Sequence, residues 1–151
     1  MMPIEWVDGD LYDAYEERSE HAEEDAWVLC MIGEMWEARS VYSKAARHYH
    51  RALQCHPSSK AAFRLCRAEF LMGNWNACLG AYQLGLNYRD APQVLDDGPV
   101  YADSSKLLVA QAYNNLGRMT EARDVARECA RLFPSSGAVA ELVDSILGGS
   151  K

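Results

Sequence analysis

The fold of this chain is decided by two stretches: residues 32–57, which read IGEMWEARSVYSKAARHYHRALQCHP, and residues 109–134, which read VAQAYNNLGRMTEARDVARECARLFP. Each begins with an aliphatic and a small residue, repeats a small residue twelve and nineteen positions after the first, and ends at a proline. Two helices that cross at close range need small side chains at the crossing, and a proline ends a helix. The pattern therefore predicts pairs of antiparallel helices. The small residues are Gly33, Ala45 and Ala52, then Ala110, Ala122 and Cys129.

A third copy lies between these two stretches, with Cys66, Cys78 and Gly85 at the small-residue positions. A thiol acts there as a compact, mildly apolar side chain. The copies divide the chain into repeats 26–58, 59–92 and 103–136, with an insertion at 89–99 between the second and the third. Residues 1–25 precede the repeats, and residues 137–151 follow them.

Trp36 and Tyr113 supply an aromatic residue three positions after the first small residue, and with them the pattern resembles the tetratricopeptide repeat over about 110 residues. The second copy departs from that family, since it has Cys66 in place of the usual glycine and Glu69 in place of the aromatic residue. The resemblance implies an all-α fold of antiparallel helix-pair repeats, a TPR-like superhelix with N-terminal and C-terminal capping helices.

Helix boundaries follow from capping and turn residues. Ser58 or Ser59, Asn74, Thr120 with Glu121, and Ser135 or Ser136 are typical helix starts, and glycines mark the turns within the second and third repeats. The last helix carries one apolar stripe, which suits either a cap or the first helix of a fourth repeat. The predicted helices are 10–23, 26–40, 43–54, 59–72, 75–88, 100–116, 120–132 and 137–147.

Composition limits the class of protein. Of the 151 residues, 49% are hydrophobic and 25% are charged, and no apolar run reaches the ~18 residues of a membrane span. The N-terminus shows no export signal, so we expect a cytoplasmic protein with no membrane partner. Five cysteines without a C-x-x-C pair predict reduced thiols.

Charge is concentrated at the N-terminus, where residues 1–26 hold ten acidic residues and one arginine within a chain of net charge −7. Nucleic-acid binding depends on clustered lysine and arginine, so this distribution argues against a nucleic-acid partner. The acidic segment, residues 8–25, either caps the first repeat through Leu11 and Tyr15 or folds back and competes with a partner.

The sequence contains no motif that is typical of a catalytic or a metal site. Nucleophile-elbow, dinucleotide and P-loop motifs are absent, so we expect no enzyme, no catalytic residues and no cofactor. His48, His50, Cys55 and His56 lie close together, but residues two apart on a helix point about 200° away from each other. No metal site is therefore predicted.

The resemblance implies a binding module, because in that family the first helix of each repeat lines a concave groove that holds a segment of a partner. We expect a protein–protein interaction module, an adaptor or complex subunit. The alternative is a small dedicated chaperone that holds a client protein, and self-association is compatible with either. The matching groove positions are Met31, Glu34, Lys60, Phe63, Arg64, Arg67, Phe70, Leu107, Gln111 and Asn114.

The centre of this predicted groove is basic. Lys60, Arg64 and Arg67 either receive an acidic stretch of a protein or peptide partner, with Phe63 and Phe70 supplying apolar contact, or form an ordinary solvated face.

Overall fold

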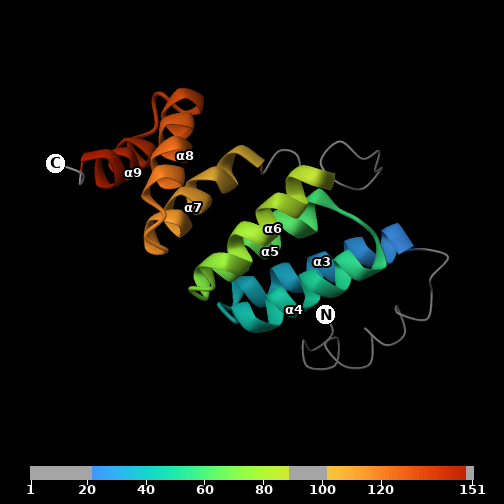
Figure 1. The fold of residues 1–151 in the computed structure, drawn as a ribbon. Coiled ribbons are helices and arrows are strands. Elements are labelled where there is room, and N and C mark those ends of the chain that lie inside the picture. The colour runs from blue at the N-terminus through green and yellow to red at the C-terminus, as the bar shows by residue number, and fades with distance from the viewer. Residues whose placement is uncertain (1–21, 89–101, 149–151) are drawn as a thin grey trace.

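The computed structural model describes residues 22–88 and 102–148, and its regular elements there are all helices (Figure 1). Among these residues there is no strand, and no helix is long and apolar enough to cross a membrane. The helices are α3 (Ala22–Ala38), α4 (Tyr42–Cys55), α5 (Ser59–Leu71), α6 (Trp75–Tyr88), α7 (Ala102–Asn115), α8 (Met119–Leu132) and α9 (Gly137–Leu147).

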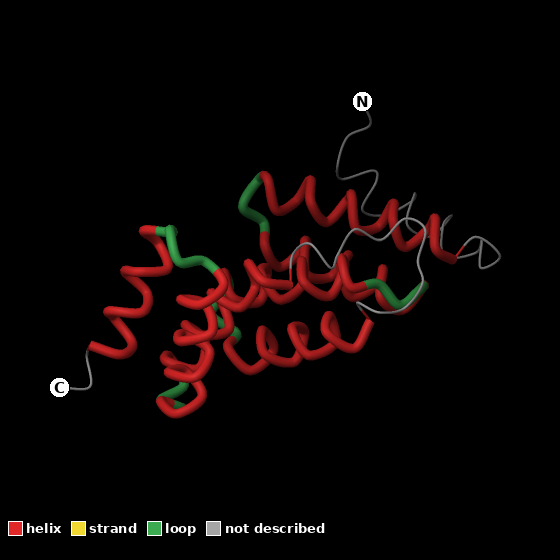
Figure 2. The backbone as a smooth tube through the Cα atoms, turned by 90° about the horizontal axis from the view of Figure 1, so that it is seen from above, coloured by secondary structure: helices red, strands yellow, loops and turns green. Residues whose placement is uncertain are grey.

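The helices pack in consecutive pairs. Short turns join α3 to α4, α5 to α6 and α7 to α8, and each pair then packs against the first helix of the next (Figures 1 and 2). The last helix, α9, packs on α8 and also touches α7. The predicted all-α fold of helix-pair repeats is confirmed.

Among the described residues the helix boundaries lie within one residue of the predicted ones, except at the two ends of α3, which ends at Ala38 instead of residue 40. α3 begins at Ala22 instead of residue 26, because the acidic run Glu23–Asp25 forms its first turn, where carboxylates are favoured by the helix dipole. α8 begins at Met119, so Thr120 is no N-cap, and Arg118 holds the cap position without a side-chain hydrogen bond. Ser58 and Ser136 do cap α5 and α9. The predicted helix 10–23 lies almost entirely outside the described residues, as does the insertion 89–99.

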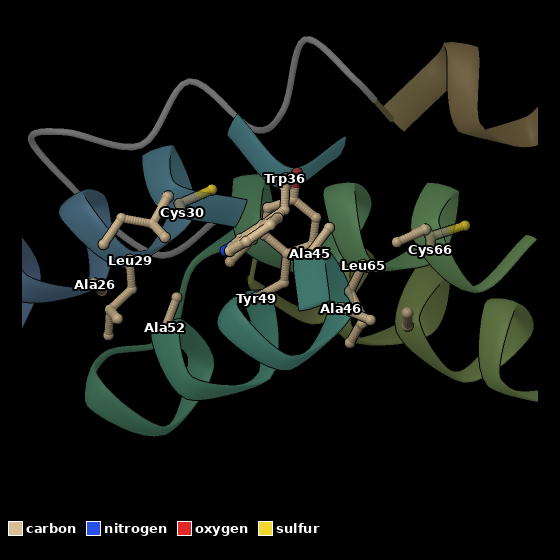
Figure 3. Packing of buried hydrophobic residues seen from close by; sticks show 14 of the residues in the cluster. Ala26, Leu29, Cys30, Trp36, Ala45, Ala46, Tyr49, Ala52, Leu65 and Cys66 are labelled. Atoms are coloured by element: carbon tan, nitrogen blue, oxygen red, sulfur yellow. The ribbon is translucent and has the colours of Figure 1, made fainter. Parts of the chain in front are cut away.

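The helices of the first two pairs approach each other closely at a glycine. A Cβ atom on Gly33 would lie 2.5 Å from Cε1 of Tyr49, and one on Gly85 would lie 2.4 Å from Cε1 of Phe63. In both pairs, an aromatic ring of one helix therefore packs directly against the backbone of the other helix. Figure 3 shows Tyr49 in the core of the first pair, with Ala45 and Trp36 nearby.

In the second pair two cysteines take the place of small residues at the crossing. Cys66 of α5 and Cys78 of α6 are buried, with their Sγ atoms 3.4 Å apart. This hydrogen bond and burial raise the pKa of Cys66, so the thiol stays protonated, as expected of a structural cysteine.

The turn inside each pair has one residue in the left-handed conformation. Gly73 and Gly117 take φ values of 79° and 76°, and Ser40 takes the equivalent place in the first pair with φ 62°. Glycine adopts this conformation without a steric penalty, whereas serine has a Cβ atom that opposes it. The first turn is therefore the strained one.

Gly33→Ala should lower the free energy of unfolding by about 1–3 kcal/mol, because the new methyl group overpacks against the Tyr49 ring. The matched control is Gly80→Ala on α6, where a Cβ meets nothing within 4 Å and should raise stability by about 0.5–1 kcal/mol. Chemical denaturation measures both. Equal effects of the two substitutions would contradict the close crossing.

Ser40→Gly should raise the free energy of unfolding by about 0.5–1 kcal/mol, because glycine relieves the left-handed backbone. Ser43→Gly, on the exposed side of the first turn of α4, should instead lower it by a similar amount. Thermal unfolding of both variants tests the assignment, which fails if Ser40→Gly destabilises the protein.

Candidate functional site

The first helices of the pairs share one face of the repeat. α5 contacts α7 directly, α7 contacts α9, and ion pairs link α3 to α5. We call this surface of α3, α5, α7 and α9 the first-helix face. Two pockets open between its helices, and six of the ten predicted groove residues line them.

The first pocket lies between α5 and α7 and has a volume of about 340 Å³. Its walls combine apolar and cationic side chains from helices that belong to different repeats. We call it the α5–α7 pocket. It is lined by Phe63, Arg64, Arg67, Ser104, Ser105, Leu107 and Leu108.

The second pocket lies between α7 and α9, with a volume of about 470 Å³. Its lining is mostly polar: α7 contributes amide side chains, including the predicted Gln111 and Asn114, and α9 contributes Glu141 and Ser145. Amide and carboxylate groups can pair with the backbone of an extended segment. α9 thus lines the face as a further first helix would.

The basic centre of the face is bound to two carboxylates of α3. Glu34 Oε1 lies 3.6 Å from Lys60 Nζ and 3.3 Å from Arg64 Nε. Glu37 Oε2 lies 3.1 Å from Arg67 Nε and 3.7 Å from Arg64 Nη1. Each of the three cations of α5 is therefore paired with a carboxylate of α3.

The position of Glu37 is fixed by a hydrogen bond from a core residue. The Tyr49 hydroxyl, whose ring packs on Gly33, donates a hydrogen bond of 3.0 Å to Glu37 Oε1. Burial, and next the Glu37 carboxylate, raise the pKa of Tyr49 well above its usual 10, so the phenol stays protonated and donating. Tyr49 of α4, Glu37 of α3 and Arg67 of α5 thus form a chain of hydrogen bonds that links three helices. Tyr49 was missed as a contributor to the site; its only sequence signal is an aromatic residue four positions after Ala45.

Met31 and Phe70 line neither pocket of the first-helix face, and Phe63 lines one of them but is buried. Met31 is 40% exposed on α3, and Phe70 packs edge-on against Trp75, with ring centroids 5.3 Å apart. Phe63 lines the α5–α7 pocket, but its side chain is buried against Gly85. It shapes the pocket floor and offers little free surface.

A third pocket, of about 360 Å³, opens on the other side of α7, among α6, α7 and α8. An ion pair between Lys106 and Glu128 lines it, together with the aliphatic Leu79, Leu86 and Val125. Across residues 22–88 and 102–148, no three His, Cys, Asp or Glu side chains are grouped to hold a metal ion.

No model of a known protein family matches the chain, and no curated protein matches it in sequence.

Tyr49→Phe should lower the free energy of unfolding by about 1–3 kcal/mol at pH 7, because Glu37 loses a buried donor. The raised pKa of Tyr49 also predicts how the free energy of unfolding changes in alkaline solution. Folding protects Tyr49 from ionising, so its contribution is full below pH ~10 and declines as the pH rises further. Denaturation from pH 7 to 11 should therefore show a shallower alkaline loss in Tyr49→Phe than in the wild type; parallel curves would contradict the link.

Proposed function

We propose that this chain is a tetratricopeptide-type binding module whose first-helix face holds a segment of a partner protein. It would serve as an adaptor or as a subunit of a complex, without catalysing a reaction. Three observations support this proposal: the sequence resemblance, the helix-pair fold, and the position of the pockets on the first-helix face.

The observation that carries the proposal is that pockets open on the first-helix face at two successive junctions, α5–α7 and α7–α9. Each has the volume of a small binding site, and together they follow the face from one repeat to the next. A segment of extended chain crossing the first helices would meet charged and apolar groups at one junction and amides at the other. This sequence of surfaces suits a peptide better than a compact small molecule.

A second candidate, a chaperone that holds a client protein, is favoured by one apolar patch. Trp27 and Met31 lie one turn apart on α3 and are each 40% exposed. Methionine adapts its shape to different apolar surfaces, which suits a holder of unfolded clients. Such a protein should slow the aggregation of its client, whereas an adaptor should bind without that effect.

Ser104→Trp should abolish partner capture, because an indole at this exposed position of α7 fills the α5–α7 pocket. The matched control is Ser43→Trp, the same change in the first turn of α4, which lines none of the three pockets. The full chain would serve as bait in an extract of its source cells, with captured proteins identified by mass spectrometry.

Proteins lost with Ser104→Trp and kept with Ser43→Trp support the proposal. If the two variants and the wild type capture the same proteins, the first-helix face is not the binding surface. Circular dichroism of both variants shows that the helices are intact.

A further inference from the structure

The three cations of α5 differ in how much of each is left for a ligand. Lys60 and Arg64 are largely covered, with side chains 14% and 26% exposed, and both lie beside Glu34. Arg67 is 53% exposed and meets Glu37 through Nε alone, at 3.1 Å. A guanidinium carries five N–H donors, so the four on the terminal nitrogens of Arg67 have no acceptor among the described residues.

The position of the Arg67 guanidinium is set in advance. Glu37 accepts from the buried Tyr49 hydroxyl on one carboxylate oxygen and from Arg67 Nε on the other. A side chain that is already ordered loses less entropy when it binds a ligand. The Nε edge is occupied, so the terminal edge of the guanidinium remains to bind a carboxylate with two parallel hydrogen bonds.

Electrostatics favours a negative group here. The Arg67 guanidinium is positively charged and 53% exposed, and only its Nε edge is paired with Glu37. A carboxylate is attracted to its terminal edge, whereas a further cation is repelled.

An apolar wall faces this donor. Leu107 and Leu108 of α7 line the same pocket as Arg67, and both are half-buried, so each keeps some surface toward the pocket. The volume of about 340 Å³ accepts an aliphatic side chain beside them. One ligand can therefore satisfy both walls only if it carries an apolar side chain and an acidic group close together.

We propose that the α5–α7 pocket binds a segment of another protein in which an aliphatic side chain packs on Leu107 and Leu108 while a neighbouring carboxylate is held end-on by Arg67. This inference rests on the proposed function and narrows it to one pocket and one ligand chemistry. Glu37 is a positioning residue in this scheme, since it acts through Arg67.

The probe for the test is a displayed library of random linear peptides, selected on the full-length wild-type chain. The peptides recovered are synthesised and their affinities measured for the wild type, Arg67→Ala, Arg67→Lys and Arg127→Ala. Arg127 is the matched control because it is also well exposed, at 62%, and is also paired with a carboxylate, but lies on α8.

We expect the selected peptides to carry Asp or Glu next to Leu, Ile or Val. Arg67→Ala should weaken their binding by about 10-fold to 100-fold, as the loss of a charge-assisted, two-bond contact implies. Arg67→Lys should weaken it nearly as much, because an ammonium cannot hold Glu37 and also present two parallel donors to the ligand. Arg127→Ala should change affinity less than about twofold.

Different failures overturn different claims. Peptides that bind the pocket, so that Ser104→Trp blocks them, but lack acidic residues or tolerate Arg67→Ala overturn this inference and leave the proposed function standing. If no peptide is recovered whose binding Ser104→Trp weakens, both are overturned.

Two other occupants are distinguished by added measurements. A synthetic peptide of residues 1–21 that displaces the selected peptides in an Arg67-dependent way would assign the pocket to the acidic segment of this chain and overturn the assignment to another protein. A dimer in sedimentation velocity that Ser104→Trp dissociates would assign the pocket to a second copy and overturn it equally.

Discussion

The structure depends on how closely the two helices of a pair approach each other. At Gly33 and at Gly85 there is no room for even a Cβ atom, because an aromatic ring of the facing helix occupies that space. Close packing of this kind fixes the rotation of each helix about its axis as well as its position. Once the side of α3 that meets α4 is fixed, the side that meets α5 and solvent is fixed too. The first-helix face is therefore a consequence of the crossings.

The Tyr49 side chain takes part both in a helix crossing and in the first-helix face. Its ring fills the space above Gly33, and its hydroxyl holds Glu37, which in turn holds Arg67 of the next pair. The polar face is thus anchored to the apolar core of the first pair. A change in the packing of α3 on α4 would move Glu37 and disturb the guanidinium at the α5–α7 pocket.

Much of the fold could be predicted because its determinants are local or periodic. Small residues recurring at fixed spacing identified the crossings, and Gly73 and Gly117 identified two turns, in which the structure shows both glycines in the left-handed conformation. Ser40 gave no such signal, since serine is common in turns of any geometry. The start of α3 was predicted too late because a run of acidic residues indicates a boundary and a favourable first turn equally well.

The site could be predicted only in part. The family resemblance placed Arg64 and Arg67 in the predicted groove, but their partners Glu34 and Glu37 come from the preceding pair, about thirty residues earlier. Which carboxylate meets which cation depends on how far one pair slides along the next, and no repeat pattern specifies that offset. Phe63 was assigned to the surface because its helix position usually faces the groove, while Gly85 leaves a hollow that draws its ring inward.

The dependence of the fold on the Gly33 crossing is tested most directly by a double-mutant cycle of Gly33→Ala and Tyr49→Leu, measured by chemical denaturation. If the methyl group at position 33 is opposed by the Tyr49 ring, the smaller leucine makes room for it. The account then predicts that Gly33→Ala costs at least about 1 kcal/mol less in the Tyr49→Leu background than in the wild type. An equal cost in both backgrounds would show that the ring does not occupy the space above Gly33, and would contradict the account.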